Sequence, residues 1–98
     1  MDSRLLIVNC HHHEFKCVPI GSFGLCDYLA RHDIPARIFN AALYSRAEYV
    51  ARLEECVLDY QPSHIGLIIH WKELLENALY LAFALKSRFP ERVILCGG

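Results

Sequence analysis

The stretch Arg4-Leu5-Leu6-Ile7-Val8-Asn9 decides the fold, because it is a continuous apolar run with a polar residue at each end. Two similar runs follow, Ile65-Gly66-Leu67-Ile68-Ile69-His70 and Arg92-Val93-Ile94-Leu95-Cys96. Runs without polar alternation are typical of parallel strands that are covered on both faces. We therefore expect a parallel sheet in which the first and third strands lie centrally.

Helical patterns separate the strands. Residues 22–32 carry apolar or aromatic side chains at positions i, i+3, i+4 and i+7, and we expect this face, Leu25, Tyr28, Leu29 and His32, to pack on the sheet. Ser45 precedes Glu48 by the spacing of a capping box and opens a second helix, which presents Tyr49, Leu53, Val57 and Tyr60 on one side. A third helix is expected over residues 72–89, before Pro90.

The second strand, residues 36–40, alternates charged and apolar side chains, which favours an edge position. Right-handed crossovers then give the strand order 2-1-3-4 of a flavodoxin-like (Rossmann-like) three-layer α/β sandwich. The fourth strand ends at Gly97-Gly98 with no helix after it. We expect a single domain over residues 1–98, truncated after strand four and part of a longer chain.

The composition narrows the functional classes. The 98 residues are 54% hydrophobic and carry 10 Lys+Arg against 11 Asp+Glu, a net charge of -1, which provides no basic surface for nucleic acid. No apolar run reaches the ~18 residues of a membrane span, and the N-terminus lacks a signal-peptide pattern, so we expect a cytoplasmic protein. Five cysteines without paired close spacing are expected to be reduced thiols, most of them buried.

The strand order predicts where a ligand binds. In an open parallel sheet, the crevice lies at the carboxyl ends of the strands where the order reverses, here between strands one and three. Its expected lining is residues 9–20, 70–72 and 97–98, and the first of these segments is longer than the usual 2 to 6 residues of a βα connection.

Several segments carry a family resemblance. The strand ending at Asn9, the turn Pro19-Ile20-Gly21 and the helix 23–32 resemble the N-terminal cobalamin-binding domain of radical S-adenosylmethionine enzymes. Gln61-Pro62-Ser63-His64-Ile65-Gly66-Leu67 is similar to that family's entry into strand three. Asn77-Ala78-Leu79-Tyr80-Leu81-Ala82 and Val93-Ile94-Leu95-Cys96-Gly97-Gly98 resemble its A-L-x-L-A helix and its V-x-x-G-G strand.

The resemblance implies a cobalamin-binding module. Gly97 and Gly98 would border the nucleotide tail, and His70 and Trp71 would line the tail or the lower corrin face. The loop from Asn9 to Ile20, which contains Pro19, would underlie the ring. The family implies methyl transfer or a radical rearrangement on a carbon substrate, with the [4Fe-4S] cluster and S-adenosylmethionine held by a downstream barrel. The family's Cys-x-x-x-Cys-x-x-Cys motif is absent from this sequence, which offers no catalytic centre of its own.

The histidine run departs from the family pattern. Relatives that replace the lower base by histidine carry Asp-x-His-x-x-Gly, whereas this chain has Asn9 and His11 in register but Glu14 at the glycine position. A neutral imidazole can ligate cobalt, so His11 is a candidate axial ligand, although many relatives leave that position without a protein ligand.

Three alternatives stay open. His11, His13 and Cys17 could bind zinc, copper or nickel, or the run could be a solvated polar loop. The domain could hold a nucleotide instead of cobalamin. Separately, Trp71 could be a packed surface aromatic, and Gly97-Gly98 could be an ordinary turn at a strand end. Strand four could pair through its free edge with the remainder of a parent chain or with a second copy in a homodimer.

Overall fold

The computed structural model of the chain describes residues 3–9, 20–41, 44–45, 47–68 and 75–97. Within these residues lies a four-stranded parallel sheet of β1 (Leu5–Asn9), β2 (Ala36–Asn40), β3 (His64–Ile68) and β4 (Val93–Gly97). The strand order is β2-β1-β3-β4. The predicted flavodoxin-like topology is confirmed, with β1 and β3 central and β2 at an edge.

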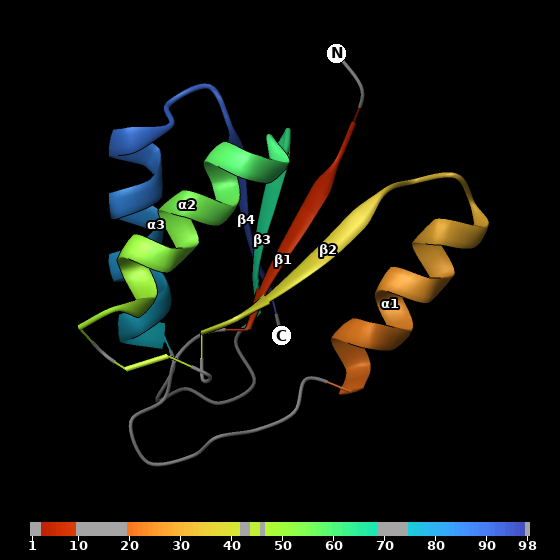
Figure 1. Ribbon diagram of the computed structural model, residues 1–98, viewed down its shortest axis with the longest axis horizontal. Helices are drawn as coiled ribbons and strands as arrows, with labels where there is room; N and C mark the ends of the chain where they lie inside the picture. Colours follow the sequence, from red (N-terminus) through yellow and green to blue (C-terminus); the bar gives the residue numbers. More distant parts are fainter. Residues whose placement is uncertain (1–2, 10–19, 42–43, 46, 69–74, 98) are drawn as a thin grey trace.

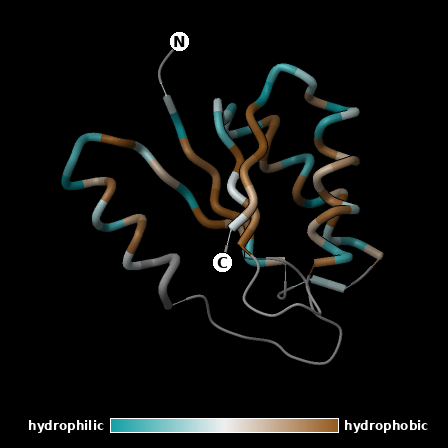
Figure 2. Tube along the Cα trace, turned by 180° about the vertical axis from the view of Figure 1, so that it is seen from behind, coloured by the Kyte–Doolittle hydropathy of each residue, from teal (hydrophilic) through white to brown (hydrophobic). Residues whose placement is uncertain are grey.

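The helices form two layers around this sheet. Helices α2 (Tyr49–Tyr60) and α3 (Leu75–Arg88) lie on one face, and α1 (Ile20–Arg31) lies on the other, beside β2 (Figure 1). The strands form the most apolar part of the trace and run between helices of mixed polarity (Figure 2). This is the expected three-layer sandwich, because each crossover returns a helix to one face of the sheet.

The main core lies between the sheet and the pair α2 and α3. Successive residues of a strand point to opposite faces, so Leu6 and Val8 of β1 face this core together with Ile65 and Leu67 of β3. The remaining buried members come from β2, the segment after it and the two helices, namely Phe39, Ala41, Tyr49, Leu53, Val57, Ala78, Leu81 and Leu85. The helical spacing of Tyr49, Leu53 and Val57 therefore predicted the buried face of α2 correctly.

The start of α2 differs from the prediction. Its N-cap is Glu48, with no side-chain cap hydrogen bond, so the expected capping box of Ser45 and Glu48 is wrong. Instead, the backbone N–H groups of Glu48 and Tyr49 both donate to the carbonyl oxygen of Ser45 over 3.0 Å. The Ser45 carbonyl oxygen thus accepts hydrogen bonds from backbone N–H groups that a capping side chain would otherwise satisfy.

The predicted packing face of α1 is also wrong. Tyr28 is 59% exposed, Leu25 and His32 are exposed, and Leu29 alone of the four is half-buried. The aromatic rings of Tyr28 and His32 contact each other in a tilted arrangement, with centroids 4.5 Å apart and an angle of 34° between the ring planes. Helix α1 lies beside the edge strand β2 rather than over the middle of the sheet. Most of the side chains that the helical spacing selected therefore stay exposed to solvent.

The described helices contain 12, 12 and 14 residues. In the part of the chain that the structure describes, none is long and apolar enough to cross a membrane. The cytoplasmic location stays a prediction.

Candidate functional site

Four residues form a row at the carboxyl edge of the sheet. The strand register places Asn9 of β1 opposite Asn40 of β2 on one side and opposite Ile68 of β3 on the other. Ile68 in turn lies opposite Gly97 of β4. The last residues of all four described strands therefore meet at the edge where open parallel sheets bind their ligands.

Asn9 is the polar anchor of this row. It is 3% exposed and is the sole buried polar residue among those that the structure describes. Its Nδ2 donates a hydrogen bond to Asn40 Oδ1 over 2.8 Å. A buried amide without a partner would cost roughly 1–3 kcal/mol, so this bond keeps a polar group at the strand end.

Asn40 was not among the residues selected from the sequence. The available signal was that the first two strands end alike, in Ile7-Val8-Asn9 and Ile38-Phe39-Asn40. Two strands that both end in asparagine bring the two side chains together only if the strands pair in register. The structure shows that β1 and β2 pair in this way, with Asn9 opposite Asn40.

Gly97 ends the other side of the row and lies open. A Cβ atom built at Gly97 would meet no heavy atom within 4 Å. The glycine is therefore not required by packing in the described protein, and its missing side chain leaves room for a ligand to approach the backbone. Asn9 and Gly97 thus lie in one row, with Ile68 between them.

The other predicted site residues lie outside the described residues: His11, His13, Cys17, Pro19, His70, Trp71 and Gly98. The structure therefore tests neither the axial-ligand prediction for His11 nor the metal prediction for His11, His13 and Cys17. Among the residues that it does describe, no group of three or more His, Cys, Asp or Glu side chains converges on a metal position.

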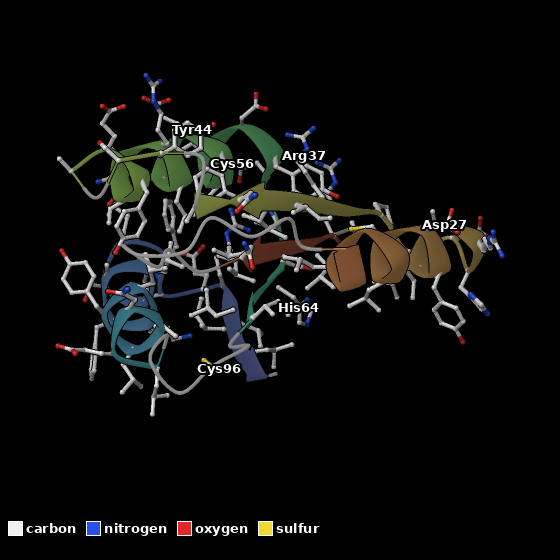
Figure 3. The ribbon with its side chains drawn as sticks, turned by 90° about the horizontal axis from the view of Figure 1, so that it is seen from below. Asp27, Arg37, Tyr44, Cys56, His64 and Cys96 are labelled. Atoms are coloured by element: carbon white, nitrogen blue, oxygen red, sulfur yellow. The ribbon has the colours of Figure 1, made fainter. Side chains whose placement is uncertain are left out.

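A second polar cluster joins β2 to α2. The Arg37 guanidinium carbon lies 4.4 Å from the centroid of the Tyr60 ring, and Arg37 Nη1 lies 3.3 Å from Asp59 Oδ2. Arg37, Asp59 and Cys56 line a surface hollow of about 430 Å³. Arg37 and Cys56 are labelled in Figure 3, beside β2 and α2. The sequence analysis did not select this cluster, because its members are spread over residues 37–60.

The Cys56 thiol of this cluster is partly withdrawn from solvent. Burial raises the pKa of the Cys56 thiol, and the nearby positive charge and hydrogen bond of Arg37 oppose that rise only in part. A thiol with a raised pKa stays protonated at neutral pH and is a poor nucleophile. Arg37 of β2 contacts both the Tyr60 ring and Asp59, and so links β2 to the end of α2.

The thiols of the described residues, Cys26, Cys56 and Cys96, are free, as expected. Their burial differs from the prediction, because Cys26 and Cys56 are half-buried and Cys96 is exposed. Cys96 belongs to β4, an edge strand of the described sheet, and this position explains its contact with solvent.

Comparisons with known protein families, curated proteins and solved structures find no match to the chain.

Proposed function

We propose that this chain is a cobalamin-binding module whose ligand approaches the carboxyl edge of the sheet between β1 and β3. The observation that carries the proposal is the row from Asn9 to Gly97 at the topological switch point. A polar anchor at one end and an open glycine at the other suit a large ligand that has both hydrogen-bonding amides and extended apolar surface.

The strand order β2-β1-β3-β4 supports the location of the site. On either side of the reversal, α1 follows β1 on one face of the sheet and α3 follows β3 on the other. In the sequence, His11 and Pro19 lie between β1 and α1, and His70 and Trp71 lie between β3 and α3. The residues that carry the family resemblance therefore follow the two strands that flank the switch point.

The residues of the row fit the group. Gly97 has open space where a side chain would stand, so a cofactor can approach the backbone there. Asn40, at the opposite end of the row, is half-buried and is held by its hydrogen bond from the buried Asn9, so its amide is the group there that an amide side chain of the corrin could reach. When bound, cobalamin supplies a cobalt-centred methyl or radical chemistry, and the chain contributes binding and orientation.

In the proposed assembly this module belongs to a larger radical S-adenosylmethionine enzyme, whose barrel holds the iron–sulfur cluster. The chain itself carries no catalytic residue in this proposal. Methyl transfer or a radical rearrangement on a carbon substrate would be the reaction of the whole enzyme, and the module would act in the cytoplasm.

The test is a titration of the purified chain with hydroxocobalamin, followed by visible absorbance and by equilibrium dialysis. Saturable binding with one cobalamin per chain is the expected result. A chain that retains no cobalamin in dialysis at any concentration tested would overturn the proposal. In a His11→Ala variant, binding that persists while the absorbance change is lost would identify His11 as the axial ligand.

A pair of glycine variants links binding to the described row. Gly97→Val adds a side chain where the protein has open space, so we expect an unchanged melting temperature and cobalamin binding weakened by about tenfold or more. Gly24→Ala is the matched control, because a Cβ at Gly24 on α1 also meets nothing within 4 Å and lies away from the row. Equal affinity in both variants would remove Gly97 from the site.

The metal-binding alternative predicts a different result. A site built from His11, His13 and Cys17 would retain stoichiometric zinc or copper through dialysis, and the His13→Ala variant would release it. Metal analysis of the dialysed protein therefore separates the two functions, because His13 has no role in the cobalamin proposal.

A further inference from the structure

The two asparagines at the ends of β1 and β2 point to the face of the sheet that carries α1 (Figure 1). Val8 and Phe39 belong to the main core on the opposite face. Asn9 and Asn40, the next residues along the two strands, therefore point away from that core. Asn9 is 3% exposed, whereas Asn40 is half-buried. Of the two amides, Asn40 is the one that a ligand at this edge can reach.

The hydrogen bond between these residues orients the Asn40 amide. Asn9 Nδ2 is the donor and Asn40 Oδ1 is the acceptor, over 2.8 Å. A side-chain amide has one acceptor oxygen and one NH2 group with two N–H donors. Because Oδ1 is turned toward Asn9, Nδ2 lies on the other branch of the Asn40 amide and is held there. Its two N–H groups allow Nδ2 to serve a ligand beside the other interaction that Asn40 makes.

We propose that Asn40 is a specificity-determining residue of this edge, and that its Nδ2 donates a hydrogen bond to an acceptor group of the ligand. Amide carbonyl oxygens and carboxylate oxygens are the acceptors of this class. In the cobalamin module proposed above, on which this assignment rests, the acceptor is the carbonyl oxygen of a corrin side-chain amide.

The position of Asn40 in the row limits the size of the ligand. Asn40 and Gly97 end the two outer strands of the described sheet, and three strand spacings separate these strands by ~14 Å. Only a large ligand contacts both residues at once, and a corrin with its side-chain amides is such a ligand.

A donor held in place makes this position selective. A corrin amide can turn to present either its oxygen or its NH2 group, whereas an ionised carboxylate offers acceptors alone. A hydrogen bond to an ionised acceptor is also stronger than one to a neutral acceptor. Hydrolysis of the corrin amide that faces Asn40 to a carboxylate should therefore preserve or strengthen binding.

The test compares hydroxocobalamin with derivatives in which one corrin amide is hydrolysed to a carboxylate, each titrated by equilibrium dialysis. At one corrin position, the wild type should bind the carboxylate at least as tightly as the parent amide. Asn40→Asp should reverse this preference and bind the same derivative about tenfold or more weakly than hydroxocobalamin, because two carboxylates then face each other without a donor. Its affinity for hydroxocobalamin itself should change by less than about threefold, since the corrin amide can turn its NH2 group toward the new carboxylate.

Asn40→Asp keeps the contact with Asn9. The new carboxylate can still accept the hydrogen bond from Asn9 Nδ2, so circular dichroism should show a folded chain. Asn77→Asp is the matched control, because it makes the same change of charge on α3, which covers the opposite face of the sheet. This control should leave the preference between amide and carboxylate unchanged at every corrin position.

Asn40→Ala gives a second test without an added charge. Loss of the Nδ2 donor should weaken binding of the carboxylate derivative by about tenfold, and by more than it weakens binding of hydroxocobalamin. This variant also tests the role of Asn40 if Asn40→Asp does not fold.

The outcomes separate this assignment from the proposed function. A wild type that binds no cobalamin overturns the cobalamin module, and the role of Asn40 with it. Cobalamin binding in which Asn40→Asp and Asn40→Ala both leave the preference unchanged at every corrin position overturns the role of Asn40 alone.

Discussion

The side-chain amide of Asn9 donates to Asn40 Oδ1 over 2.8 Å and joins the ends of the two parallel strands β1 and β2. Asn9 is buried, whereas Asn40 is half-buried. This hydrogen bond satisfies the buried Asn9 amide at the carboxyl edge of the sheet without a water molecule. The stability of the fold and the shape of the candidate site therefore depend on the same contact.

A double-mutant cycle on this pair measures the contact. Asn9→Ala removes the donor and Asn40→Ala the acceptor, and each should lower the free energy of unfolding by about 1–2 kcal/mol. The coupling energy between the two substitutions should be about 1 kcal/mol in urea denaturation. Strictly additive effects would mean that the bond contributes nothing, and the cycle corrects for the other interaction that Asn40 makes.

Central packing is tested at Leu67. Leu67 is fully buried in β3 between β1 and β4, so Leu67→Ala should lower the free energy of unfolding by about 2–5 kcal/mol, and Leu67→Asp should abolish folding. Leu58→Ala is the control, because Leu58 is exposed on α2 and its loss should cost less than about 0.5 kcal/mol. Cooperative melting of Leu67→Asp would contradict the assignment of β3.

The end of α1 offers a stabilising substitution. Asp33 has a φ of 59°, in the left-handed region, and the hydrogen bonds from Ile34 N to Leu29 O and from Asp33 N to Ala30 O form a Schellman motif. Glycine adopts this conformation without strain, so Asp33→Gly should raise the free energy of unfolding by up to about 1 kcal/mol. Chemical denaturation measures the gain, and Asp33→Val should have the opposite effect.

Gln61 is the natural comparison for Asp33. Its φ is 54° at the end of α2, but its side chain also donates to Leu58 O and accepts a hydrogen bond from Arg92. Gln61→Gly should therefore gain less than Asp33→Gly, because it relieves strain and removes two hydrogen bonds together. An equal gain at both positions would mean that the Gln61 side chain contributes nothing to stability.

Alkaline pH should destabilise the fold. Burial raises the pKa of Cys26, Cys56 and Tyr60 in the folded protein. A group whose pKa is higher in the folded state stabilises the fold below its unfolded pKa, and that contribution is lost as the pH rises through the folded pKa. The melting temperature should therefore fall once the pH exceeds about 8.5, the unfolded pKa of a thiol.

A thiol variant isolates this contribution. Cys56→Ala removes one titrating group, so its melting temperature should depend less steeply on pH than that of the wild type above about pH 8.5. Cys96→Ala is the control for the removal of an exposed thiol. A wild-type melting temperature that rises with pH over this range would contradict the direction of the shifts.

The sequence by itself determined the strands and their order. Continuous apolar runs in β1 and β3 require cover on both faces, and the charged alternation of β2 tolerates an edge, so the order 2-1-3-4 follows from burial and handedness. The spacing of Tyr49, Leu53 and Val57 likewise determined the buried face of α2, because a helix beside a complete sheet face has one apolar side to bury.

Only the tertiary structure decided which side chains meet. The pairing of Asn9 with Asn40 depends on the register of β1 and β2, and the exposure of Tyr28 depends on where α1 lies against the sheet. A helical pattern records which residues share a face, but it carries no information on what that face contacts. For the same reason the sequence did not reveal the groove between α3 and β4, which Leu79, Phe83 and Ile94 help to line, since its residues lie on two elements whose contact local spacing does not encode.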